Sequence, residues 1–116
     1  MPKRNLADMD PRERFFAGFI LNKLWIDRYW CGEGKRQHLG HTSLDNVPKG
    51  RSRGEKGEIL EVADNLNRLG FICIVKSNQD EHVCASRAPD KIREGLPIVN
   101  EYRAQVGLAA ITQADI

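Results

Sequence analysis

The stretch SRGEKGEILEVADNLNRLGFICIVKSNQDEHVCAS, residues 52–86, decides the fold. Ser52 is followed three residues later by Glu55, which is the spacing of a capping box at the start of a helix. The sequence then predicts a helix over residues 53–69, and Gly70 can adopt the left-handed conformation that ends it. Apolar residues recur through this range at helical spacing: Ile59, Val62, Ala63, Leu66 and Leu69.

Two β-rich runs follow this helix, and together they predict a hairpin. Residues 71–76 and 82–86 form the strands, and a tight turn over residues 77–80 joins them. A two-residue turn tip sets a register in which Cys73 faces Cys84. One face of the hairpin is then apolar, as an antiparallel sheet favours: Ile72, Ile74, Val83 and Ala85.

A long apolar helix is predicted near the N-terminus. Asp10 and Glu13 form a second capping box, and the helix is expected to run to about Cys31, where Gly32 and Gly34 stop it. Its apolar residues cover more than one stripe: Phe15, Phe16, Phe19, Ile20, Leu21, Leu24, Trp25, Ile26 and Trp30. Such a helix is either central to the core or partly buried by a second subunit.

The remaining segments complete the expected order of elements. Residues 1–9 are expected to form a loose basic arm, and residues 42–47 a single short helix. A helix beginning near residue 89 is expected to break or kink at Gly95 and Pro97 before continuing to about residue 106.

Composition narrows the class of protein. The chain has 116 residues, 41% hydrophobic and 29% charged, which is ordinary for one globular domain. Its start leads into acidic residues without an apolar signal segment, so we expect a cytoplasmic protein with no membrane span. Three cysteines, an odd number, argue against a disulfide scaffold.

Positive charge is concentrated in the first half of the chain. Residues 1–56 contain 12 Lys and Arg against 7 Asp and Glu, a net of +5, whereas residues 57–116 contain 6 against 9, a net of −3. A basic front half is compatible with a polyanionic partner, although solvated surfaces often look the same.

The element order, together with HTSLDNVPKG at residues 41–50 and LNRLGFI at residues 66–72, resembles the winged helix-turn-helix superfamily. More narrowly, these stretches resemble small uncharacterised winged-helix-like proteins of archaea. The resemblance implies an α+β, mostly helical winged-helix domain over residues 10–95. A C-terminal helix and tail would follow over residues 96–116.

The resemblance also implies a function. Most members of the superfamily bind duplex DNA, with the third helix in the major groove and the hairpin wing on the backbone or minor groove, while a substantial minority mediate protein contacts. Here the third helix is residues 53–69 and the wing is residues 77–81. Acidic residues depart from the DNA-binding pattern on the exposed face of the helix and on the wing: Glu58, Glu61, Asp64, Asp80 and Glu81.

The basic, glycine-rich stretch before and within the start of the third helix is the strongest candidate site. Cationic side chains beside helix amides attract phosphate oxygens. The expected phosphate-binding residues are Lys49, Arg51, Arg53 and Lys56, which Lys35 and Arg36 could extend. Asn65 and Arg68 are the expected readers of bases. The alternative is a solvated loop whose charges serve solubility.

Gly54 and Gly57 also match the GxxG loop of KH-type RNA-binding domains. The strand that should precede such a loop is poor in this sequence, so KH-like RNA binding is a lesser alternative. The stretch is not a P-loop, because no Lys-Ser/Thr pair follows the last glycine.

The sequence contains no motif for metal binding or for catalysis. One group of possible ligands is Cys31, His38 and His41, and a second is Cys73, His82 and Cys84. Neither group supplies the four ligands that zinc needs, and no CxxC pair is present. No nucleophile, base and orienting carboxylate can be placed together. We therefore expect no metal, no cofactor and no enzyme activity.

The preferred hypothesis is a small regulator-like protein that binds nucleic acid, with duplex DNA favoured over RNA. Its rival is a protein–protein interaction or dimerisation module that kept the fold. A homodimer could use the N-terminal helix or the C-terminal segment over residues 98–111.

Overall fold

The computed structural model describes residues 6–31, 42–77 and 80–116, and it is an α+β fold, as predicted. The helices are α1 (Pro11–Ile26), α2 (Arg53–Leu69) and α3 (Pro89–Gln105). The strands are β1 (Thr42–Ser43), β2 (Ile72–Ser77) and β3 (Asp80–Ala85). Three short 3-10 helices are η1 (Leu6–Asp8), η2 (Leu44–Asn46) and η3 (Gln113–Asp115).

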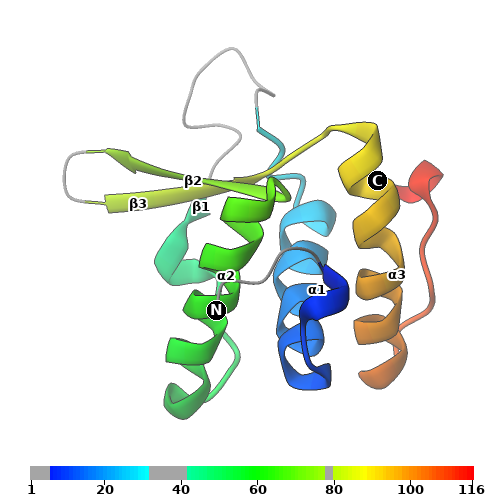
Figure 1. The fold of residues 1–116 in the computed structure, drawn as a ribbon, viewed down its shortest axis with the longest axis horizontal. Helices are drawn as coiled ribbons and strands as arrows, with labels where there is room; N and C mark the ends of the chain where they lie inside the picture. Colours follow the sequence, from blue (N-terminus) through cyan, green and yellow to red (C-terminus); the bar gives the residue numbers. More distant parts are fainter. Residues whose placement is uncertain (1–5, 32–41, 78–79) are drawn as a thin grey trace.

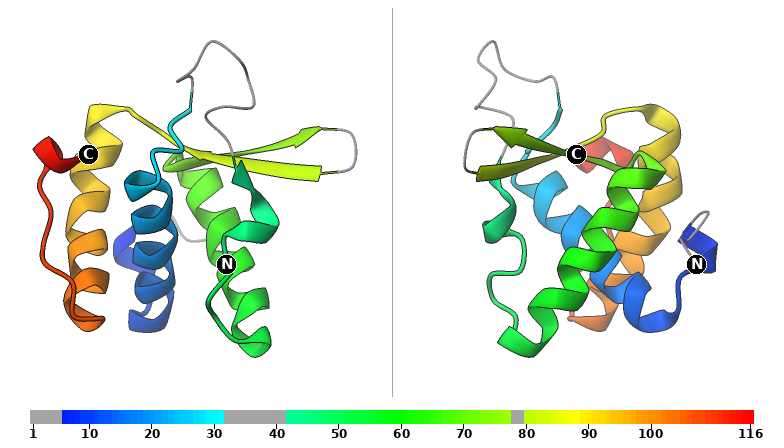
Figure 2. Two further views of the ribbon diagram at one scale, coloured as in Figure 1. Left: turned by 180° about the vertical axis from the view of Figure 1, so that it is seen from behind. Right: turned by 60° about the vertical axis from the view of Figure 1, so that its left-hand side comes forward.

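The helices stand side by side with α1 in the middle, and the sheet lies across one end of them (Figure 1). The sheet is antiparallel with the strand order β1-β3-β2. The β2–β3 hairpin projects beyond α2, away from α3 (Figure 2). The hydrophobic core therefore lies between the three helices and beneath the base of the hairpin.

α2 forms as predicted. Both bonds of the capping box between Ser52 and Glu55 are present, and Gly70 ends the helix at a φ of 88°. Its core-facing side buries apolar residues at helical spacing: Ile59, Val62, Ala63 and Leu66. The observed ends of α2 match the predicted ends, because the capping box, the apolar periodicity and the terminal glycine all indicate the same helix.

The hairpin register is also confirmed. Cys73 faces Cys84, and Ile74 faces Val83. The Asn67 side chain reaches from α2 to the outer edge of β2, where its Oδ1 accepts a hydrogen bond from the Ile74 N–H at 3.1 Å. The Ile74 amide therefore points away from β3.

α1 ends at Ile26, so the prediction that it runs to about Cys31 was wrong. Arg28 adopts a left-handed conformation with a φ of 62°. The Tyr29 N–H donates to the Leu24 carbonyl at 2.9 Å, and the Arg28 N–H donates to the Trp25 carbonyl at 3.2 Å. These two bonds form a Schellman motif, the usual way for a helix to end, although glycine normally occupies its left-handed position.

The chain after α1 runs beside β3. The Ala85 N–H donates to the Tyr29 carbonyl at 2.7 Å, and the Cys31 N–H donates to the Ala85 carbonyl at 2.8 Å. A disulfide joins Cys31 to Cys84, with their Cα atoms 5.0 Å apart. The odd number of cysteines had argued against a disulfide scaffold; one bond is present, and Cys73 is free.

α3 is continuous, so the predicted interruption at Gly95 and Pro97 was wrong. Gly95 packs closely against the Trp25 ring of α1. A Cβ added at Gly95 would lie 3.1 Å from that ring. Pro97 is exposed, so the carbonyl that its missing N–H leaves free can bond to water. The predicted boundary between residues 95 and 96 falls within this single helix.

α1 and α3 pack antiparallel and very closely. A Cβ at Gly18 would lie 2.5 Å from Tyr102 Cβ and 2.7 Å from the Ile98 carbonyl oxygen. The Arg14 side chain donates to Glu101 at 2.7 Å, and Arg103 donates to Asn22 at 2.9 Å.

Two further segments differ from expectation. Leu6 and Met9 are buried, so the loose arm predicted for residues 1–9 does not include η1; residues 1–5 lie outside the described residues. Residues 42–47 contain β1 and the single turn η2 in place of a short α-helix. Among the described ranges, no helix is long and apolar enough to span a membrane.

Candidate nucleic-acid interface

The candidate interface lies at the N-terminal end of α2 and in the turn before it. The Arg51 N–H donates to the Pro48 carbonyl at 3.1 Å, and Gly50 makes the turn at a φ of 90°. This geometry feeds the chain into the Ser52 cap of α2. All four predicted phosphate-binding residues, Lys49, Arg51, Arg53 and Lys56, therefore come from one short stretch, but they do not share one environment.

Arg51 is turned into the molecule. Its Nη2 lies 2.7 Å from Glu55 Oε2 in an ion pair, and its side chain is only 30% exposed. Its guanidinium also stacks over the rings of Phe15 and Phe19 on α1, 5.3 and 5.9 Å from their centroids. Because its charge is neutralised and its face is covered, Arg51 holds the α2 entry against α1 and is a poor phosphate ligand.

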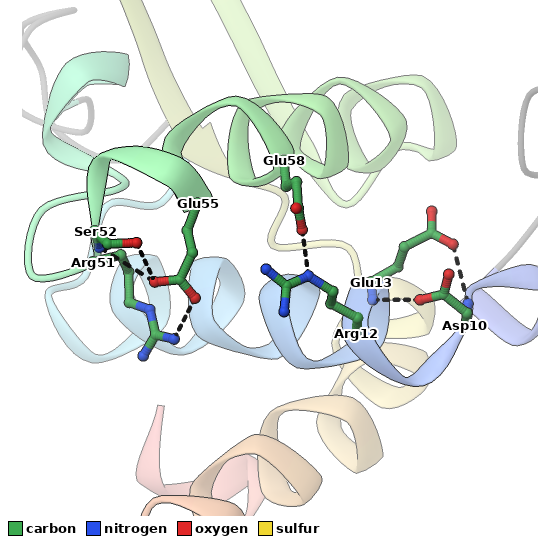
Figure 3. Close-up of polar contacts among 7 residues, drawn as sticks. All are labelled: Asp10, Arg12, Glu13, Arg51, Ser52, Glu55 and Glu58. Carbon is green, nitrogen blue, oxygen red and sulfur yellow. Dashed lines mark hydrogen bonds and ion pairs between the residues drawn. The ribbon is translucent and has the colours of Figure 1, made fainter.

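Glu55 is the acceptor that organises this turn (Figure 3). It accepts hydrogen bonds from Arg51, from the Ser52 hydroxyl at 3.0 Å and from the Ser52 N–H at 3.2 Å. The Arg51 bond, followed by the Ser52 bonds, lowers the pKa of Glu55 to about 2. The carboxylate is thus ionised at neutral pH.

Lys49, Arg53 and Lys56 are exposed, and we call them the cationic cluster. Within the part of the chain that the structure describes, they form no ion pair. A Cβ placed on Gly57, one residue further along the helix, would meet nothing within 4 Å. A ligand can therefore approach both these charges and the helix backbone.

The other predicted contacts lie apart from this cluster. Arg68 donates to Asn65 at 2.8 Å near the C-terminal end of α2. Lys56 and Arg68 are twelve residues apart, which corresponds to about 18 Å of helix. Exposed Glu61 and Asp64 lie between them in the sequence. Lys35 and Arg36 lie outside the described residues.

Glu58, expected to repel phosphate, is instead paired with Arg12 of α1 (Figure 3). The hydrogen bond and the charge of Glu58 raise the pKa of Arg12. Local sequence patterns do not indicate this partnership, because the two residues are 46 positions apart and belong to different helices. The pair also lines a pocket between α1 and α2, together with Asp10, Glu13, Phe16, Glu61 and Val62.

The structure bears on two alternative sites, a KH-type RNA-binding loop and a metal site. Gly54 and Gly57 lie inside α2, so they do not form the loop that a KH-type GxxG motif requires. Cys31 and Cys84 are bonded to each other and cannot act as thiolate ligands. His38 and His41 lie outside the described residues, among which no group of three or more metal-ligating side chains is gathered.

No family model, curated protein or solved structure matches the chain.

Proposed function

We propose that the protein is a winged-helix domain that binds nucleic acid, duplex DNA in preference to RNA, through the N-terminal end of α2. The observation that carries this proposal is the cationic cluster of Lys49, Arg53 and Lys56, which lies exposed beside the first turn of a helix and has no ion-pair partner among the described residues. A helix N-terminus adds partial positive charge to such a cluster.

The topology supports the winged-helix part of the proposal. A strand precedes the turn that leads into α2, and a hairpin follows α2 directly. In the sheet, β1 pairs with β3 and not with β2, as in winged helices. In this proposal α2 is the recognition helix, the β2–β3 hairpin is the wing, and η2 stands in for the preceding helix.

The charges along α2 limit how the helix would contact a duplex. Phosphates would be attracted to the cationic cluster and repelled by Glu61 and Asp64 further along. We therefore expect the first two turns of α2 to approach DNA, and phosphate contacts to dominate over base reading. Three such contacts correspond to a slope of about −2.7 in a plot of log affinity against log salt.

Fluorescence anisotropy with a labelled random duplex at low salt tests the proposal. The double variant Arg53→Ala/Lys56→Ala should weaken binding and make the salt slope shallower by about 1.8, because two phosphate contacts are removed. The matched control is Lys23→Ala/Arg93→Ala, which removes the same charge from α1 and α3. Equal losses in both variants, or no binding by the unaltered protein, would overturn the proposal.

Arg51→Ala separates the structural role from the binding role. This variant should lower the melting temperature, because it removes the ion pair to Glu55 and the contacts with α1. Below its melting temperature it should keep the affinity and the salt slope of the unaltered protein. Competition between single-stranded RNA and duplex DNA then determines which nucleic acid is preferred.

A protein–protein or dimerisation module remains the second candidate, because α1 presents an apolar outer stripe. Phe15, Phe19 and Ile26 lie on one side of α1; the two phenylalanines are half-buried and Ile26 is 46% exposed. This candidate is favoured if the two double variants behave alike and the protein sediments as a dimer that Ile26→Glu dissociates.

A further inference from the structure

The two faces of the β2–β3 hairpin differ in character. Alternate residues of β2 and β3, including Ile72, Val83 and Ala85, are buried in the core. On the opposite face Cys73 is exposed with a free thiol. Cys84 shares that face, is only 1% exposed and is bonded to Cys31. All three cysteines of the chain therefore meet on one side of the sheet.

We propose that Cys73 and the Cys31–Cys84 disulfide form a thiol–disulfide exchange site. In this site the bond moves between Cys31–Cys84 and a cross-strand Cys73–Cys84 pair. The inference does not depend on nucleic-acid binding, and it concerns residues far from the cationic cluster.

The register places the incoming thiol next to the bond. Cys73 and Cys84 are direct cross-strand partners, so their side chains lie on the same face. The Ile74 N–H points to Asn67, away from β3, which makes Cys73–Cys84 a hydrogen-bonded pair of the ladder. Cα atoms in such pairs are about 5.5 Å apart, within the range that a disulfide spans.

The position of the Cys84 sulfur supports the same pairing. Cys84 Sγ lies 3.9 Å from the Cys73 carbonyl oxygen, so the disulfide lies against β2 at the residue that would attack it. Cys84 is therefore the central sulfur, with one possible partner on each side.

The exchange is balanced without any added oxidant or reductant. Cys73 loses its proton to solvent, and its thiolate attacks Cys84 Sγ. A Cys73–Cys84 bond forms while the Cys84–Cys31 bond breaks, and the electron pair leaves with Cys31 Sγ, which takes up a proton. One disulfide and one thiol are present before and after the step.

The exchange would change what the hairpin is tied to. In the observed state a covalent bond links β3 to the segment that follows α1. After exchange the hairpin is cross-linked within itself, and Cys31 is held to β3 only through hydrogen bonds such as its N–H to the Ala85 carbonyl. The site thus acts as a switch in the attachment of the hairpin to the helical layer.

Peptide mapping can follow the exchange, because trypsin separates the three cysteines. Cys31, Cys73 and Cys84 fall in the tryptic peptides 29–35, 69–76 and 77–87. Folded protein is incubated at pH 8.5, quenched with acid and N-ethylmaleimide, and digested at a pH below 7. We expect peptide 69–76 to appear linked to 77–87, with Cys31 newly alkylated.

A displaced thiol provides the matched control. In the variant Cys73→Ser/Val75→Cys the thiol keeps the same face of β2 but moves two residues away from Cys84, and alkylation of Cys31 should be at least tenfold slower. Equal rates in the two proteins would overturn the proposal. So would formation of Cys31–Cys73 as readily as Cys73–Cys84, which would indicate scrambling through unfolded chains.

A second variant tests the pairing even if the observed disulfide dominates at equilibrium. Cys31→Ser removes the competing partner and leaves two thiols across the hairpin. With oxidised glutathione this variant should form Cys73–Cys84. If it forms only mixed disulfides with glutathione while remaining folded, the exchange site does not exist.

Discussion

Arg51 and Glu55 show how strongly one residue's surroundings can change its role. In the sequence Arg51 is one of four cations within residues 49–56, and its residue type does not distinguish it from Arg53. In the fold its guanidinium is held by Glu55 and by the rings of two phenylalanines on α1. Its spacing of four residues from Glu55 was visible in the sequence, but the aromatic surface was not, because α1 is some thirty-five positions away.

The depressed pKa of Glu55 predicts an acid-dependent contribution to stability. A carboxylate with an ordinary pKa of 4.5 that falls to about 2 in the folded protein favours folding most above pH 4.5. That contribution is lost as the pH falls towards 2. Glu55→Gln should therefore be clearly less stable than the unaltered protein at pH 7, and the difference should shrink between pH 4.5 and 2.

Urea unfolding of both proteins at pH 7, 4 and 2.5 measures this difference. Glu94→Gln is a suitable control, because Glu94 is largely exposed and lies 4.0 Å from Lys91. A deficit for Glu55→Gln that stays constant down to pH 2.5 would contradict the assigned role of the Arg51 and Ser52 bonds.

At the scale of elements, the two helices α1 and α2 end in the same way with different residues. Both place a left-handed residue after the last turn, Gly70 for α2 and Arg28 for α1. Glycine adopts this conformation without cost, whereas a residue with a Cβ is destabilised by about 1–2 kcal/mol.

Arg28→Gly is therefore expected to raise the free energy of unfolding by about 1 kcal/mol, after allowing for the greater freedom of glycine in the unfolded chain. Gly70→Ala should lower it by a similar amount. Chemical denaturation of the two variants measures both changes. A loss of stability in Arg28→Gly would show that the Arg28 side chain contributes more than its backbone strain costs.

The same comparison explains which elements the sequence could predict. α2 and the hairpin were predicted correctly because cap, apolar period and turn are all local signals. The end of α1 was missed because an arginine in the left-handed position gives no such signal. The continuity of α3 was missed because Gly95 is required by the Trp25 ring of α1, a contact distant in sequence.

The residues of the candidate site also divide into those whose surroundings local sequence predicts and those whose surroundings depend on packing. Exposure of Lys49, Arg53 and Lys56 was expected from their place at a helix start. The covering of Arg51 by Phe15 and Phe19, and the pairing of Glu58 with Arg12, depend on how α1 packs against α2. Local sequence does not contain that packing.

At the scale of the whole molecule, the Cys31–Cys84 bond links residues 53 positions apart. Loops of this length restrict the unfolded chain strongly, and we expect reduction to lower the free energy of unfolding by about 2–4 kcal/mol. Guanidinium unfolding of Cys73→Ser with and without reductant measures the loss without interference from exchange. Cys31→Ser/Cys73→Ser should be insensitive to reductant; a response there would mean that the reductant acts elsewhere.

The disulfide also bears on where the protein works. Disulfides persist in oxidising compartments, whereas cytosolic reductants keep most thiols free. The observed disulfide form is therefore the one expected in an oxidising compartment, whereas the reduced and less stable form would predominate in a cytoplasm.

The contact between Asn67 and the Ile74 amide has a consequence for copies of the chain that meet in a crowded solution. An uncovered sheet border with β-rich residues invites strands from neighbouring molecules to stack onto it, which is how fibrillar deposits begin. The Asn67 side chain occupies the Ile74 amide in the middle of this strand edge, so the row of amides available to another strand is interrupted there. A residue that adds nothing to the core thus removes one of the donors that a stacking strand would use.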